Sequence, residues 1–212
     1  MKITIIGAGL EGRGIGTRLV AGGNDVELID ADFEAAHTAA EELSAHGAGS
    51  ATANDAGSID GELVILAIPY GAVADAISQY GDQLDGKVVV DVTNPVDFAT
   101  FEGLVVPPDS SAAEEITKLV PAGTPVLKAF NTTFGGTLVS GSVAGQQLQV
   151  LIAGDDDAAK EKLGAAAEEG GLQAIDVGPL RRARQLEQLG FLHMSLQDRL
   201  GTQFGSAVKF IW

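Results

Sequence analysis

The sequence predicts an α/β fold in which helices cover both faces of a doubly wound, mostly parallel sheet. Two observations support this prediction. Short apolar runs, rich in valine, isoleucine and leucine, alternate along the chain with longer helical stretches, an order typical of doubly wound sheets. The predicted strands are also continuously apolar, as strands buried on both faces are.

The individual elements follow from these runs and from the breaks between them. Strands are expected at 3–6, 25–30, 62–68, 87–92, 126–130, 148–153 and 172–177. Helices are expected at 10–21, 32–46, 72–80, 155–169 and 179–191, with weaker helical character beyond 191. The proline-rich stretch 94–125 is expected to form loops at the carboxyl edge of the sheet, with one helix at 111–119.

The composition excludes several classes of protein. The 212 residues include no cysteine, which excludes a disulfide scaffold, a thiolate metal site and an iron–sulfur protein. The net charge of −16 disfavours nucleic acid and anionic membranes as partners, and it would also suit a high-salt cytoplasm. The 45% of hydrophobic residues argues against a disordered acidic chain.

The N-terminus carries no targeting signal that we recognise. Its apolar run, 3–6, is shorter than the roughly 7–15 residues of a secretory core or the about 20 of a membrane span. We therefore expect a cytoplasmic protein.

A complete G-x-G-x-x-G pattern follows the first predicted strand and opens the first helix. Gly7 would allow the tight turn, Gly9 would let the backbone approach a pyrophosphate, and Gly12 would let the helix pack on the strand. The amides of Leu10 and Glu11 would lie at the helix N-terminus, which attracts anions. The alternative is a tight strand–helix turn without a ligand.

Asp30 ends the second predicted strand and indicates the type of dinucleotide. A carboxylate there binds both ribose hydroxyls of NAD and repels the 2′-phosphate of NADP. Ala31 and Asp32 follow it, and no lysine or arginine occurs between Arg18 and Lys87. On this evidence NAD is favoured, the alternative being that Asp30 caps the next helix.

Three further strands end in small or polar residues at the same edge of the sheet. These strand ends hold Ala67, Ile68, Pro69, Asn94, Pro95, Asn131 and Thr132. Ligands bind outside the carboxyl ends of the strands in such sheets, so together they are expected to form a pocket wall. Taken singly, each also fits ordinary turn chemistry.

The acid–base and metal chemistry of the sequence is sparse. His37 and His46 are expected to be solvated on the second helix, and His193 to be a packed helix residue. The acidic run 155–157 is better explained by helix capping than by a cation, and Lys128 by pairing with a backbone or carboxylate oxygen. We therefore assign no catalytic acid or base and no metal site, and hydride transfer between two cofactors would not require one.

Several segments resemble F420-dependent NADP oxidoreductases over nearly the whole chain. They are ITIIGAGLEGRG, ILAIPY, VVVDVTNP, VLKAFNTT, LIAGDDDAAK and IDVGPLRRARQLEQL. The resemblance implies a Rossmann-like homodimer that transfers a hydride between a nicotinamide dinucleotide, usually NADP, and the deazaflavin coenzyme F420.

The resemblance also implies where the two cofactors lie. The nicotinamide would lie over Ala67, Ile68 and Pro69. The deazaflavin would lie against Asn94, Pro95, the segment 131–136 (which begins with Asn131 and Thr132) and the helix carrying Arg184. Arg181 and Arg182 would meet its anionic tail or, as an open alternative, be solvated.

Two positions depart from the pattern of the family. Asp30, Ala31 and Asp32 stand where members usually carry Ser-Arg-Arg-like residues for the 2′-phosphate, and Gly190 stands where some place a threonine near the deazaflavin. Two alternative functions therefore remain. One is an NAD(P)H-dependent reductase of another flavin or small acceptor, and the other is a dinucleotide-binding module without catalysis.

The organisation expected from the sequence is a dinucleotide-binding domain followed by a helical segment. The domain would cover 1–177, with a core at 1–140 and a sheet extension at 141–177, and the segment would cover 178–212. The apolar end, 208–212, is expected to be buried at a dimer interface or across the cofactor crevice.

Overall fold

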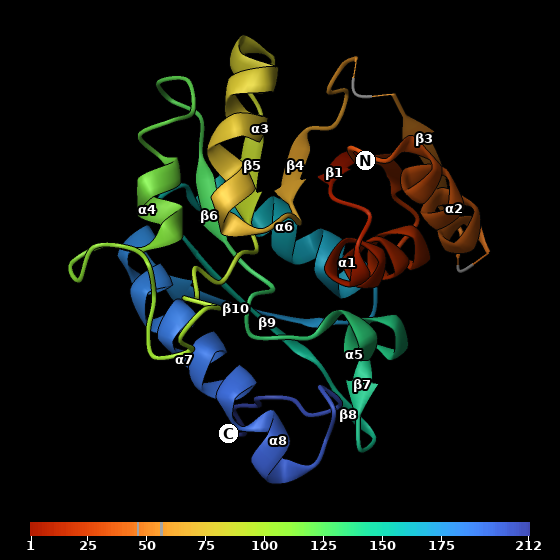
Figure 1. Ribbon diagram of the computed structural model, residues 1–212. Helices are drawn as coiled ribbons and strands as arrows, with labels where there is room; N and C mark the ends of the chain where they lie inside the picture. Colours follow the sequence, from red (N-terminus) through yellow and green to blue (C-terminus); the bar gives the residue numbers. More distant parts are fainter. Residues whose placement is uncertain (46, 56) are drawn as a thin grey trace.

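The computed structural model describes residues 1–45, 47–55 and 57–212 and confirms the predicted Rossmann-like α/β fold (Figure 1). In these residues eight strands form one sheet in the order β10-β9-β6-β5-β4-β1-β2-β3. Neighbouring strands are parallel except for β6 and β9, which are antiparallel. The sheet is therefore mostly parallel, as the continuously apolar strands predict.

The bounds of the elements are as follows. The sheet contains β1 (Lys2–Ile6), β2 (Asp25–Ile29), β3 (Ser50–Asn54), β4 (Leu63–Leu66), β5 (Val88–Asp91), β6 (Val126–Lys128), β9 (Gln149–Gly154) and β10 (Gln173–Gly178). A separate hairpin consists of β7 (Ser142–Val143) and β8 (Gln146–Gln147). The α-helices are α1 (Leu10–Ala21), α2 (Phe33–Ser44), α3 (Val73–Tyr80), α4 (Ala112–Ile116), α5 (Gly135–Ser140), α6 (Asp157–Glu169), α7 (Ala183–Ser195) and α8 (Gln197–Leu200). Short 3₁₀ turns are η1 (Tyr70–Ala72), η2 (Gly81–Leu84) and η3 (Leu180–Arg182).

Most predicted elements are confirmed to within a few residues, and α1 has the predicted bounds. The strand β3 was not predicted, because SATAN has no apolar run and lies at the sheet edge, paired only with β2. The helix α5 and the hairpin after it were also missed, since α5 has only six residues and begins with two glycines. His46, at the predicted end of the second helix, lies outside the described residues.

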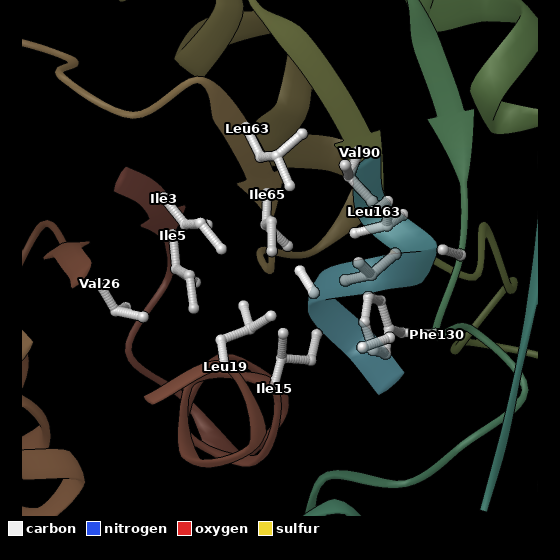
Figure 2. Close-up of a cluster of buried hydrophobic side chains, with 14 of the residues drawn as sticks. Ile3, Ile5, Ile15, Leu19, Val26, Leu63, Ile65, Val90, Phe130 and Leu163 are labelled. Atoms are coloured by element: carbon white, nitrogen blue, oxygen red, sulfur yellow. The ribbon is translucent and has the colours of Figure 1, made fainter. Parts of the chain in front are cut away.

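Helices cover both faces of the sheet, with a separate apolar cluster on each face. On one face α1 packs on β1 and β2, α2 packs on β2 and β3, and α6 packs on β9 and β10. Figure 2 shows Ile15 and Leu19 of α1 pointing toward Ile5 and Ile65. On the other face, α3 and α4 pack against β4 and β5. The carboxyl ends of β1, β4, β5 and β6 are therefore held rigidly in one row.

Strands β9 and β10 extend the sheet beyond the row of carboxyl ends. Since β9 pairs with β6 only where Leu127 and Lys128 face Gly154 and Ala153, the earlier residues of β9 run past the end of β6. Helix α7 packs on β9 and β10 through Leu186. This arrangement places α7 next to the carboxyl ends of β5 and β6 (Figure 1).

The C-terminal tail lies against the start of β9 and is open to solvent in the single chain. The side chain of Gln149 hydrogen-bonds both the amide (2.7 Å) and the carbonyl (2.8 Å) of Phe210. Ile211 and Trp212 are each 85% exposed, so the expectation that the tail is buried across the crevice is wrong for this chain. Burial at a dimer interface stays a prediction. No helix in the described residues is long and apolar enough to span a membrane.

Candidate functional site

The glycine pattern forms a tight turn that brings α1 onto the sheet. Gly7 has a φ of +109°, and a Cβ there would lie 2.2 Å from the carbonyl oxygen of Ala67. A Cβ at Gly12 would lie 1.9 Å from the carbonyl oxygen of Gly7. A side chain at either position would therefore push β4 or α1 away, which agrees with the roles predicted for both glycines.

Gly9 differs from the other two glycines because it faces open space. It is the N-cap of α1, no side chain caps the helix, and a Cβ there would meet nothing within 4 Å. The amides of the first turn, including those of Leu10 and Glu11, therefore have no side-chain cap. Free amides at the N-terminus of a twelve-residue helix, approached over a glycine, are the arrangement that binds a pyrophosphate.

Glu11 is a carboxyl group held close to this helix end. Burial raises the pKa of Glu11 to about 7, against the opposing effect of a hydrogen bond from the Gly135 backbone. Helix α5 causes this burial, since its first residue packs against α1 so closely that a Cβ on Gly135 would lie 2.3 Å from the Leu10 carbonyl oxygen. With a pKa of about 7, the Glu11 carboxyl is only partly ionised at neutral pH, so it places less negative charge near this helix end than an ordinary glutamate would.

Asp30 lies at the end of β2 and braces the glycine-rich turn. One of its carboxylate oxygens accepts a hydrogen bond from the amide of Ala8 (2.7 Å), and the other accepts one from the amide of Asp32 (3.0 Å). The N-cap of α2 is Asp32, which accepts from the amide of Glu34. The alternative reading of Asp30 as the helix cap is therefore wrong.

A cavity of about 450 Å³ opens beside this turn. It lies between the carboxyl ends of β1 and β2 on one side and α3 on the other. The lining residues are Ile6, Gly7, Ile29, Asp30, Ala31, Ile68, Pro69, Ala72, Asp75, Ala76, Gln79 and Tyr80. Five of the predicted site residues line it, namely Gly7, Asp30, Ala31, Ile68 and Pro69. Ala67 lies next to Gly7 but does not line the cavity.

The contribution of α3 to the cavity was not foreseen from the sequence. Ala72, Asp75, Ala76, Gln79 and Tyr80 recur at helical spacing of three or four residues. That spacing marks one face of a helix, but it does not distinguish a ligand-facing side from a core-facing one. The feature of the sequence that could have indicated a ligand-facing side is the pair of small residues on this face, Ala72 and Ala76, which leave room for a flat ligand.

A polar wall follows at the ends of β5 and β6. The Asn94 side-chain amide donates to the carbonyl of Asn131 (2.8 Å), while the Asn131 side-chain amide donates to the Asn94 side-chain oxygen (2.9 Å) and to the carbonyl of Leu186 (2.8 Å). Pro95 and Thr132 are buried in the same wall. None of these four predicted site residues lines the cavity; they form a separate surface under α7.

Gly190 of α7 seals this wall. A Cβ there would lie 2.5 Å from the Asn94 side-chain oxygen and 2.8 Å from the Asn131 carbonyl oxygen. The side-chain oxygen of Asn131 is buried without a hydrogen-bond partner in the part of the chain that the structure describes, as is the hydroxyl of Thr93. The wall therefore holds two buried polar atoms that have no partner among the described residues.

A buried group of three charges supports the wall from below. The Lys128 ammonium lies 2.8 Å from the Asp91 carboxylate, 2.9 Å from that of Glu187 and 2.5 Å from the Thr93 carbonyl oxygen. Burial raises the pKa of Glu187, and the nearby Lys128 opposes this shift. Glu187 also accepts a hydrogen bond from the amide of Ala112 at the start of α4. The prediction that Lys128 pairs with carboxylate and backbone is thus confirmed.

The remaining titratable candidates are engaged in structural contacts. His193 is buried, with one ring nitrogen 3.2 Å from the Thr132 carbonyl oxygen and the other 2.8 Å from the Ser206 hydroxyl. Burial lowers its pKa. Its ring also packs on Phe134. His193 is therefore a packed helix residue, as predicted, while His37 is exposed.

Arg184 and the acidic run before α6 also have partners. Arg184 forms two hydrogen bonds with the Glu114 carboxylate (2.6 and 2.8 Å) and does not line the cavity. Arg181 and Arg182 are exposed. Asp156 caps α6 by accepting from the amide of Ala159, which agrees with the capping interpretation. Among the described residues, no group of three or more potential metal ligands is found.

Comparison with known proteins agrees with this arrangement. A family model described as NADP oxidoreductase coenzyme F420-dependent matches residues 2–95. The F420-dependent NADP reductase of Methanothermobacter marburgensis is 30% identical, over 94% of this chain and 95% of that protein. Metalloreductase STEAP3 of Rattus norvegicus is also 30% identical over 89% of this chain, which spans only 36% of that longer protein. A crystal structure from Arthrobacter sp. FB24, provisionally named an F420-dependent NADP reductase, matches all of both chains with a TM-score of 0.83 and 28% identity.

Proposed function

Since this chain belongs to the family of F420-dependent NADP reductases, we propose that it transfers a hydride reversibly between a nicotinamide dinucleotide and coenzyme F420. The observation that carries the proposal is that the α1 N-terminus, the cavity and the polar wall all lie at the carboxyl ends of β1, β4, β5 and β6. An arrangement of this kind suits two ligands that meet end to end at the strand ends.

The dinucleotide fits the first part of this arrangement. Its pyrophosphate would be held by the amides that follow Gly9, where a Cβ would otherwise project into open space. Its adenosine would enter the cavity between Ile29 and Ala76. The nicotinamide end would then extend past Ile68 and Pro69 toward the polar wall.

We propose the polar wall as the surface that receives the deazaflavin. Asn94 and Asn131 fix one another, so their position requires no ordering when a ligand binds. The side-chain oxygen of Asn131 is unpaired among the described residues but buried under α7, so α7 would have to shift before a ring N–H could donate to it. Pro95 and Thr132 are buried beside this pair and would adjoin the ring only after the same shift. Arg184 would have to release Glu114 before it could meet an anionic group.

In this proposal the protein positions the reactants, and the two cofactors supply the redox chemistry. Hydride passes between C4 of the nicotinamide and C5 of the deazaflavin, with one solvent proton balancing the reaction NAD(P)H + H⁺ + F420 ⇌ NAD(P)⁺ + F420H₂. His193 and Lys128 are buried and already paired, so neither is poised as an acid or base. The strand ends would hold the two rings in a near-attack geometry, with reacting atoms about 3–3.5 Å apart.

A second function, reduction of another flavin or of a metal chelate, is favoured by the 30% identity to a protein named metalloreductase. The test offers purified protein NADH or NADPH with F420, FMN, FAD or a ferric chelate as the acceptor. Oxidation of the dinucleotide with F420, at least about tenfold faster than with any other acceptor, would support the proposal. Preference for a flavin or the chelate would favour the second function, and no turnover with any acceptor, despite tight dinucleotide binding, would favour a binding module.

We also propose that residues 1–177 form the dinucleotide-binding domain and that 178–212 form the segment through which two copies of the chain associate. Large apolar side chains gather on this segment and the neighbouring loop: Phe98, Phe101, Leu192, Leu200, Phe204, Phe210, Ile211 and Trp212 are exposed. The stretch 190–212 carries only one aspartate, one arginine and one lysine in a chain of net charge −16. A nearly neutral, apolar surface is where two strongly acidic copies would repel one another least. The same overall acidity argues against nucleic acid as a partner.

A further inference from the structure

The charged side chains at the adenosine end of the cavity are both acidic. Asp30 stands at the end of β2, and Asp75 stands opposite it on the first turn of α3. In the described residues, no lysine, arginine or histidine lines this cavity. The charged groups that a ribose would meet there are therefore both negative, and the other polar side chains of the lining, Gln79 and Tyr80, carry no charge to balance a phosphate.

The Asp30 carboxylate is fixed in place but retains the capacity to bind hydroxyl groups. Each of its oxygens accepts one backbone hydrogen bond, from Ala8 or from Asp32. A carboxylate offers about four lone-pair sites, so each oxygen can accept one more donor. The 2′- and 3′-hydroxyls of an adenosine ribose supply two such donors.

The arginine next to the glycine-rich turn, Arg13, already has partners. The chain has no lysine or arginine from 19 to 86. Arg13, one turn into α1, donates from Nε to the Ala8 carbonyl (2.9 Å) and pairs with the Glu42 carboxylate (2.5 Å). A 2′-phosphate at the rim would therefore face Asp30 without a free guanidinium to balance it.

We propose that the dinucleotide of this enzyme is NAD(H), with Asp30 as the residue that selects it and Asp75 adding repulsion from across the cavity. The inference rests on the proposed function in that it takes this cavity as the adenosine site. The proposed preference for NAD(H) differs from that of the relatives, whose names specify NADP. The two free hydroxyls of the adenosine ribose in NAD(H) can donate hydrogen bonds to Asp30. In NADP(H) the 2′-phosphate would instead bring a negative charge close to the carboxylates of Asp30 and Asp75, which would repel it.

The test measures dissociation constants of NADH and NADPH by fluorescence titration in the absence of F420. The wild-type protein should bind NADH at least about tenfold more tightly than NADPH, because hydrogen bonds to a charged group are replaced by repulsion. This ratio should shrink as ionic strength rises, since repulsion at a partly exposed site is screened.

Variants separate the charge of these residues from their structural roles. Asp30→Asn keeps the side-chain shape and should bring the ratio to within about threefold of unity. If that variant fails to fold because the turn at Ala8 loosens, Asp75→Lys, on the exposed surface of α3, should raise NADPH affinity while NADH affinity stays similar. Asp85→Asn, an exposed aspartate before the amino end of β5, is the charge-matched control and should change neither constant.

The outcomes distinguish this inference from the proposed function. Equal or tighter binding of NADPH by the wild type would overturn NAD selection while leaving a dinucleotide enzyme in place. An unchanged ratio in folded Asp30→Asn and in Asp75→Lys would also overturn it. Failure of the wild type to bind either dinucleotide would overturn both the inference and the proposed function.

Discussion

At the scale of single residues, Glu11 is the side chain whose protonation the fold alters most clearly. Its pKa rises from 4.5 to about 7 because the carboxyl group is buried between α1 and α5. The folded state therefore holds a proton that the unfolded chain has lost between these two pH values. Burial of the neutral carboxyl group therefore contributes to the free energy of unfolding fully below about pH 4.5, and this contribution is lost as the pH rises through about 7.

Glu11→Gln should remove this pH dependence. Glutamine keeps the shape and an acceptor for the Gly135 amide but carries no charge. Its melting temperature should exceed that of the wild type above about pH 7, and the difference should shrink toward pH 4.5. Glu168→Gln, on the exposed side of α6, is the control. A constant difference between Glu11→Gln and wild type across this range would contradict the account.

Lys128 is the residue on which the buried charges depend. Lys128→Met would leave the Asp91 and Glu187 carboxylates buried without a cation, and it should lower the free energy of unfolding by about 3–5 kcal/mol. Glu187→Gln keeps the Lys128–Asp91 pair and an acceptor for the Ala112 amide, so its loss should be smaller. Urea denaturation of both variants tests this order, and equal losses would show that the charges do not act as one group.

Local sequence spacing was enough to predict the residues of the glycine-rich turn, and it failed for groups assembled from distant segments. Gly7, Gly9 and Gly12 lie within six positions, so their spacing alone reveals the turn. Glu187 pairs with Lys128 although the two lie 59 positions apart in the sequence. The sequence around Glu187 predicts only a helix and gives no sign of this pairing. The partner of Arg184, Glu114, was hidden for the same reason.

At the scale of elements, α7 fits against the polar wall only because residue 190 is a glycine. Gly190→Ala would drive a methyl group into the Asn94–Asn131 pair and should lower the free energy of unfolding by about 1–3 kcal/mol. Gly164→Ala in α6 is a matched control, since its Cβ would meet the nearest atom at 3.4 Å. That change should be neutral or stabilise by up to about 1 kcal/mol, as alanine favours a helix. Equal effects of the two changes would refute the close fit of α7.

Elements with a full hydrophobic pattern were predictable, and those at edges were not. The strands β4 and β5 are buried on both faces; β4 is apolar throughout, and β5 is apolar up to its last residue, Asp91. The strand β3 pairs on one side only and is half exposed, so its residues need no such pattern. Helix α5 is fixed by glycine-to-backbone packing against α1, a contact that leaves no periodic signal in the sequence.

At the scale of the whole molecule, the exposed apolar end of the chain predicts association of two copies. Removing Phe210, Ile211 and Trp212 deletes residues that are at least half exposed in one chain. If they lie in a dimer interface, the shortened protein should elute as a monomer at concentrations where the full chain is a dimer. Size-exclusion chromatography with light scattering decides this, and an unchanged dimer of unchanged melting temperature would refute the role of the tail.

The net charge of −16 also acquires a clearer meaning from the structure. Both proposed ligands are anionic, yet the proposed phosphate site is the uncapped N-terminus of α1, and no lysine or arginine among the described residues lines the neighbouring cavity. The acidity of Asp30 and Asp75 at its rim is therefore a feature of selection rather than an incidental part of the surface.

The central claim is that the protein brings two flat cofactors together for direct hydride transfer. The most direct measurement supplies NADH deuterated at C4, on one face and then on the other, and determines the isotope content of the F420H₂ formed by mass spectrometry. The account predicts that one of the two labelled forms delivers its deuterium to C5 of the deazaflavin without exchange with solvent. Formation of unlabelled F420H₂ from both forms, or no F420H₂ with either NADH or NADPH, would contradict it.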